Sequence, residues 1–447
     1  MLVASILLAF AATPLPTGAI DRTLPNGLEV TIVPDRSMPL VATQIWIHVG
    51  SANEDADSRG LAHLFEHLMF GGSAAYAKGD YSKFVTAAGG DENAFTSEDE
   101  TVYVSEVPPD AVEGVIRREA DRLRNLIVSQ ANLDNEKKIV TEELRLRTEN
   151  DPMARLLVKA QKALLGRHPY AFDPSGSKED VQRTTVEGAR AFYDRYYRPN
   201  EAHVVIAGPV DPDASLALVE ETFGRIESGG QGASDVPPLY GWPFPGKLAL
   251  KEDIPPVEVA LVGVPLPPAD APDSWAVEVL LKLLTGREVD PAREIVVTKR
   301  RKAIEAGIEA ISLRRGGGIV FYSASLPYRR EATALRILDE TIRELDKKEW
   351  LSDASLAAAK RSLLLEETRE HRFAEALADR VGRERWWRGD AGLAFTRAAR
   401  IGAVSREDVA AAWDRYVRDG ARIRVYVKPE HVPFAIRMFG WLYPLFS

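Results

Sequence analysis

Two histidines and a glutamate lie close together in an otherwise apolar stretch of the sequence. His63, Glu66 and His67 all fall within GLAHLFEHLMFGG, residues 60–72. On a helix, residues four apart lie on the same face, so both imidazoles can point at one metal ion. Glu66 is offset beside them, where its carboxylate suits a base that holds water. The alternative is two partly exposed polar side chains on an ordinary helix, although the whole chain contains only seven histidines.

A metal site of this kind needs a third protein ligand from elsewhere in the chain. The helical pattern LDNEKKIVTEELRLRTE, residues 133–149, contains Glu136 and Glu143, which are seven residues apart and so share a face. Glu142 points about 100° away from Glu143. Apolar residues flank the face that carries Glu136 and Glu143, and buried carboxylates are costly unless a cation compensates them. A solvated, glutamate-rich helix with basic neighbours is the alternative.

The segments around these residues predict the elements that would position them. Residues 58–70 have the apolar density of a buried helix, and residues 110–165 follow a helical pattern. Runs rich in β-branched and aromatic residues predict strands at 28–35, 41–50, 101–108 and 202–211.

The two halves of the chain resemble each other. Residues 186–211 align with residues 406–431 at a constant offset of 220, and both segments contain an Asp-Arg-Tyr triplet at the end of an amphipathic helix that leads into a strand. This match indicates a duplication. The second half has no counterpart of the paired histidines, so metal chemistry would belong to the first half.

Composition and turn signals predict the domain organisation. Residues 227–246 are rich in Gly, Pro and Ser, which is typical of a linker. We therefore expect four parts: a signal or disordered segment at 1–19, a metal-binding α/β domain at 20–226, the linker at 227–246, and a homologous non-catalytic α/β domain at 247–447.

Charge and residue usage exclude several classes of protein. A net charge of −9 argues against nonspecific nucleic-acid binding. The absence of cysteine excludes disulfides, thiolate ligands and a cysteine nucleophile. The apolar residues 2–12 resemble a secretory signal, which predicts a periplasmic or secreted protein, with a cytoplasmic one as the alternative. We expect no membrane span.

Taken together, these motifs resemble the inverted-zincin, pitrilysin-type metallopeptidases. The resemblance rests on His63, Glu66 and His67, followed by Glu136 and Glu143, and it covers nearly the whole chain. More specifically, the chain resembles the branch that includes the mitochondrial processing peptidase and bacterial relatives, and within it a bacterial catalytic subunit. The implied fold is α+β: two duplicated α/β domains related by a pseudo-twofold axis, each an antiparallel-rich sheet packed with helices.

The resemblance implies a role for each matching residue of a zinc endopeptidase or oligopeptidase. One Zn²⁺ per chain would be held by His63, His67 and Glu143. Glu66 would be the general base that activates water, and Glu136 an auxiliary acidic residue. An exposed edge strand would receive the backbone of a peptide or unfolded polypeptide through Asn93, Ala94, Phe95 and Thr96.

One departure from the family pattern concerns partners. The family's second domain usually supplies an Arg and a Tyr about seven residues apart, but no tyrosine lies seven residues after Arg293, Arg300 or Arg301. We therefore expect a heterodimer whose non-catalytic subunit supplies this pair, with a homodimer as the alternative.

Two other functions stay open: a structural or assembly subunit that retains a zinc site without proteolysis, and a metal-dependent hydrolase of non-peptide bonds. The intact Glu66 disfavours the first, and the edge segment disfavours the second.

Overall fold

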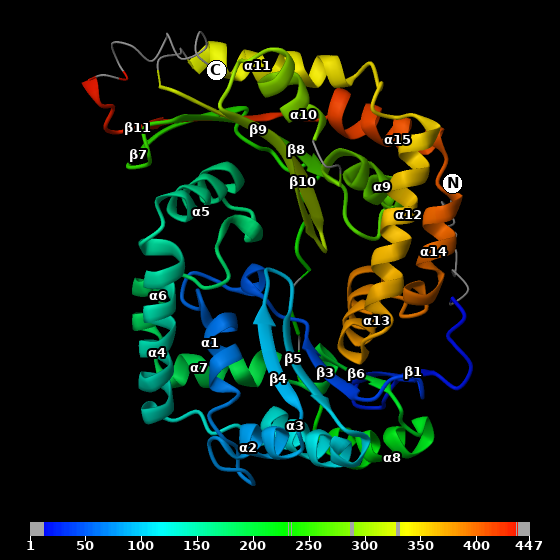
Figure 1. Ribbon diagram of the computed structural model, residues 1–447. Helices are drawn as coiled ribbons and strands as arrows, with labels where there is room; N and C mark the ends of the chain where they lie inside the picture. The colour runs from blue at the N-terminus through cyan, green and yellow to red at the C-terminus, as the bar shows by residue number, and fades with distance from the viewer. Residues whose placement is uncertain are drawn as a thin grey trace, which may run out of the picture.

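The computed structural model describes residues 13–230, 232–233, 235–286, 290–327, 331–434 and 436. Two β-sheets, each packed with helices, form the two halves of the molecule (Figure 1). The apolar residues 2–12 of the predicted signal lie outside the described residues. Among the described helices, none has the length and apolar character needed to cross a bilayer.

The first sheet has six strands, and only the β2–β6 pair is parallel. In spatial order they are β1 (Ile20–Thr23), β2 (Glu29–Pro34), β6 (Ala202–Gly208), β3 (Val41–Ile47), β5 (Thr101–Val107) and β4 (Asp91–Thr96). One face of the sheet packs on a large apolar core with helices of the first half. The helices of this half, apart from one described below, are α1 (Leu61–Leu68), α2 (Asp80–Ala87), α3 (Val112–Asn125), α4 (Gln130–Leu144), α6 (Lys178–Arg183), α7 (Val186–Tyr196) and α8 (Pro212–Thr222).

The second sheet repeats this plan with five strands, of which only β7 and β11 pair in parallel. In spatial order they are β7 (Lys247–Glu252), β11 (Ile423–Pro429), β8 (Glu258–Leu266), β10 (Gly316–Ser325) and β9 (Glu305–Leu313). Its helices include α9 (Ser274–Thr285), α10 (Pro291–Arg293), α11 (Glu331–Leu345), α12 (Asp353–Glu370), α14 (Leu393–Ala403) and α15 (Arg406–Ala412). The repeated strand order confirms the predicted α+β fold of two similar halves.

One helix of each half packs against the sheet of the other half (Figure 1). Helix α5 (Pro152–Leu165) of the first half places Leu156 against valines and leucines of the second sheet. Helix α13 (Ala374–Arg388) of the second half packs Leu377, Ala378 and Val381 against Trp46 and its neighbours on the first sheet. The two helices occupy matching positions in the duplication, since they lie about 220 residues apart. The domain limits at 226 and 247 stay a prediction.

The contact between α13 and the first sheet requires a glycine. Gly382 lies so close to the Trp46 indole that an added Cβ would overlap the ring. Trp46 cannot easily turn aside, because it is fully buried and its Nε1 donates to Gln44 Oε1 at 2.9 Å.

We expect Gly382→Ala to destabilise the protein by about 1–3 kcal/mol, as overpacking of a buried contact does. A thermal melt followed by circular dichroism measures the loss. Gly402→Ala is the matched control, because Gly402 also lies in a helix but nothing surrounds its Cβ position. Equal melting temperatures for the two variants would contradict the prediction.

The expected elements of the first half form where the patterns predicted them. The strand predictions at 28–35, 41–50, 101–108 and 202–211 are confirmed by β2, β3, β5 and β6, and the apolar helix by α1.

Candidate metal centre

Helix α1 is anchored at its first turn by a buried carboxylate. The backbone N–H groups of Gly60 and Ala62 each donate to Glu54 at 2.8 Å. Carboxyl oxygens suit this position, since the unpaired N–H groups at a helix N-terminus need hydrogen-bond acceptors. Burial raises the pKa of Glu54 to about 8. The short helix is thereby oriented, with His63 buried and with Glu66 and His67 partly exposed.

Helix α4 presents its glutamates to α1. Ser129 caps α4 by accepting from the Asn132 backbone N–H, and Leu133, Val140 and Leu144 pack into the first core. Further along the same helix, the Lys137 ammonium donates to the Gln182 carbonyl at 2.9 Å. These contacts fix the rotation of α4, so its carboxylates face the histidines.

His63, His67 and Glu143 converge on one point. Nε2 of His63 lies 3.7 Å from Oε1 of Glu143, and Nε2 of His67 lies 3.5 Å from Oε2 of the same carboxylate. The three potential ligand atoms lie within 4.8 Å of one another. Among the described residues, this is the one cluster of three or more such side chains able to hold a metal ion.

The donor set fits zinc. Tetrahedral zinc with bonds of about 2.1 Å needs donor atoms about 3.4 Å apart, and two imidazole nitrogens with one carboxylate are a usual catalytic ligand set. Burial lowers the pKa of His63, so its imidazole is neutral and able to coordinate. The structure thus brings together the three predicted ligands, and their role as ligands stays a proposal.

Glu66 is held by the edge strand. The hydroxyl of Thr96 donates to Oε2 of Glu66 at 2.7 Å. This hydrogen bond joins α1 to the end of β4 and restricts the orientation of the carboxylate beside the histidines.

The predicted substrate segment is an edge strand. In the described part of the first sheet, β4 pairs with β5 on one side and has no strand on the other. Ala94 packs against the core of the first half, and Phe95 meets Trp46 edge-on with ring centroids 6.3 Å apart. Such a strand leaves backbone groups free along one side, where an extended peptide can add.

Two cations touch the glutamates of α4. Arg147 Nη1 lies 2.6 Å from Oε1 of Glu143, and Lys78 Nζ lies 2.8 Å from Oε1 of Glu136. The spacing of four residues from Glu143 to Arg147 is a sequence signal for an ion pair on a helix. Lys78 was missed by sequence reasoning, because no local pattern connects a loop lysine with a helix 58 residues further on.

The second half is built without such a centre at the corresponding place. At 220 residues after His63 and Glu143 stand Leu283 and Leu363, both buried in the second core. Two of the arginines considered above for the Arg/Tyr pair form ion pairs within the second half: Arg293 pairs with Glu305, and Arg300 pairs with Glu344.

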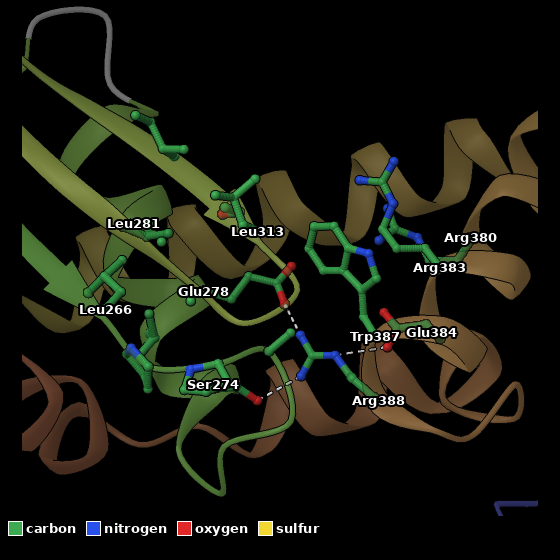
Figure 2. A pocket seen from close by; sticks show the side chains of 18 residues that line it. Leu266, Ser274, Glu278, Leu281, Leu313, Arg380, Arg383, Glu384, Trp387 and Arg388 are labelled. Carbon is green, nitrogen blue, oxygen red and sulfur yellow. Dashed lines mark hydrogen bonds and ion pairs between the residues drawn. The ribbon is translucent and has the colours of Figure 1, made fainter. Parts of the chain in front are cut away.

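A cavity of about 200 Å³ lies in the second half, between α13, α9 and the ends of β8–β10 (Figure 2). Figure 2 shows Arg388 among the lining residues, reaching Ser274, Glu278 and Glu384. Leu266, Leu281 and Leu313 form part of its apolar lining. None of the predicted site residues lines this cavity, and the charge of Arg388 is already compensated by Glu278 and Glu384.

Comparison with known proteins places this arrangement in a family. The protein-family model described as "Insulinase (Peptidase family M16)" matches residues 30–166 of this chain. A second family model, described as "Peptidase M16 inactive domain", matches residues 183–363. An uncharacterized zinc protease of Mycobacterium leprae is 30% identical over 354 residues, which cover 77% of this chain and 77% of that protein. The chain belongs to peptidase family M16.

One further relative is similar in sequence, and two solved structures share the fold. Zinc protease PqqE of Helicobacter pylori is 27% identical over 337 residues, covering 75% of this chain and 76% of that protein. The crystal structure of a protease from H. pylori superposes with a TM-score of 0.80 at 24% identity, over 94% of this chain and all of that one. The periplasmic protease PqqL of Escherichia coli has a TM-score of 0.72 at 20% identity, over 98% of this chain and 51% of that one. The predicted family is confirmed, whereas the processing-peptidase branch stays a prediction.

Proposed function

We propose that this M16 chain is a zinc-dependent endopeptidase or oligopeptidase. The observation that carries the proposal is the convergence of His63, His67 and Glu143, with Glu66 beside them. Relatives named zinc proteases support it. His63, His67 and Glu143 would hold one Zn²⁺ per chain. The bound ion would act as a Lewis acid on a water molecule and on the peptide carbonyl.

Glu66 and strand β4 would carry out proton transfer and substrate binding. Because Thr96 occupies Oε2 of Glu66, the other carboxylate oxygen is left to accept a proton from the attacking water. Glu66 then returns that proton to the leaving amine. The free edge of β4, through Asn93, Ala94, Phe95 and Thr96, would align the substrate backbone beside the base. An edge strand favours peptides and unfolded segments, which can adopt an extended conformation.

We propose further that this chain is the catalytic subunit of a heterodimer. The support is that no tyrosine lies seven residues after Arg293, Arg300 or Arg301, together with the ion pairs that occupy Arg293 and Arg300. A homologous subunit would then supply the groups that grip the substrate; a homodimer is the alternative. The apolar N-terminal segment supports a periplasmic or secreted location for the complex.

Removal of the metal tests the proposed activity. We expect dialysis against a chelator to abolish cleavage of a fluorogenic peptide panel, and one equivalent of Zn²⁺ to restore it. The assay uses this chain alone and this chain mixed with a homologous candidate partner that lacks the zinc residues. Cleavage that survives metal removal would contradict the zinc peptidase.

Two further outcomes separate the alternatives. Tight zinc binding without cleavage, alone and with the partner, would instead identify a structural subunit. Full activity of this chain alone would contradict the heterodimer and leave the peptidase standing.

A further inference from the structure

The loop between α1 and α2 brings a lysine to the back of the candidate metal centre. Gly72 has a φ of 98°, and a Cβ at this position would lie 2.7 Å from the backbone nitrogen of Lys78. The loop therefore folds tightly on itself. The Asp80 carboxylate accepts from the Ala77 N–H at 3.0 Å and fixes the next turn. The backbone of Lys78 is thus held in place, while its side chain remains half exposed.

Lys78 reaches the one buried carboxylate of this centre that is not a proposed ligand. Glu136 is only 7% exposed in its side chain. Its Oε1 accepts from Lys78 Nζ at 2.8 Å and from Asn135 Nδ2 at 2.9 Å. Its Oε2 lies 3.9 Å from Nδ1 of His67, the ring nitrogen that does not face Glu143.

The two oxygens of Glu136 therefore serve different partners. A metal-bound histidine commonly directs its second ring N–H at a carboxylate, which fixes the tautomer and the ring orientation. Glu136 is placed to do this for His67, provided that its carboxyl group does not turn toward the metal. A cation bound to one of its oxygens holds the group in this orientation and offsets the cost of burying it.

We propose that Lys78 is a positioning residue of the zinc centre, acting through Glu136 on His67. Lys78 fixes Oε1 of Glu136, so that Oε2 faces Nδ1 of His67 and Nε2 of His67 is left for zinc. This inference rests on the proposed function and gives Glu136 a role at His67. An exposed ion pair alone would contribute little, but here the partner is buried.

The sign of the change in zinc affinity tests this role. Removing a positive charge close to zinc would strengthen zinc binding if Lys78 acted only as a charge. We expect instead that Lys78→Met raises the zinc dissociation constant about 10-fold, as loss of an outer-shell partner does. Competition with a chromophoric chelator measures this constant independently of activity. Lys78→Arg should restore most of the affinity, and Lys83→Met, which removes an exposed lysine of α2, should leave it unchanged.

A double-mutant comparison tests the route. In a Glu136→Gln background, Lys78→Met should cause no further weakening, because the group it holds is already neutral. Full additive loss in the double variant would overturn the proposal, as would unchanged or tighter zinc binding by Lys78→Met alone. If the wild-type protein binds no zinc, the proposed function fails and this inference fails with it. Tight wild-type binding with an unaffected Lys78→Met variant overturns the inference alone.

Discussion

Replacement of Glu66 by glutamine is expected to abolish peptide cleavage while zinc remains bound. Glutamine keeps the size of the side chain and an oxygen that can accept from Thr96, so α1 and β4 stay joined. It cannot take a proton from water, and the loss of a general base costs about 100- to 10,000-fold in rate. We therefore expect kcat to fall at least about 100-fold.

Zinc content is measured on the same preparation by atomic absorption, because His63, His67 and Glu143 are untouched in this variant. A Glu66→Gln protein that turns over peptide normally in its proper assembly would refute the assignment of the base. Loss of zinc together with activity would mean that Glu66 belongs to the ligand set.

The second large effect is expected at the third ligand. Glu143→Gln should lower zinc affinity at least about 10-fold, since it removes the negative donor between the two histidines. The neighbouring Glu142→Gln is the matched control. Glu142 is 56% exposed and pairs with Arg145 on another side of α4.

Both variants lose one negative charge from the same helix, so a difference between them reports on position and not on net charge. Zinc content after dialysis, together with chelator competition, decides the comparison. If Glu142→Gln loses as much zinc as Glu143→Gln, the wrong carboxylate has been assigned.

Local periodicity was sufficient to predict the core of this centre. His63 and His67 share a face because they are four residues apart, and Glu136 and Glu143 share a face because they are seven apart. Both statements depend only on helix geometry. That the two faces meet could not be derived from spacing, and it was predicted by resemblance.

Strand β4 could not be predicted from its residue types. Its sequence, DENAFT, has little of the β-branched character that predicts a strand, and on sequence alone it reads as a polar turn. It is a strand because all six of its residues, Asp91–Thr96, pair with β5 in antiparallel register. The hydroxyl that holds Glu66 follows from that long-range pairing. The Lys78–Glu136 contact was equally hidden, since it depends on how the loop after α1 folds.

The exchange of helices was hidden for a similar reason. Helical periodicity in 110–165 indicates that α5 has an apolar side, but not which sheet receives it. The duplication indicates that α5 and α13 play matching roles, and the structure adds that each packs on the opposite sheet.

The exchange of α5 and α13 opposes any motion that separates the two halves of the molecule. Swinging the two halves apart would uncover the Trp46 side of the first sheet and the Leu156 side of the second at the same moment, so the apolar surface of both would enter water together. A hinge in the 227–246 segment is therefore opposed by two separate interfaces. In the proposed peptidase, a polypeptide would therefore reach the centre through movement of loops, or of this whole chain against a partner subunit, and not through separation of its own halves.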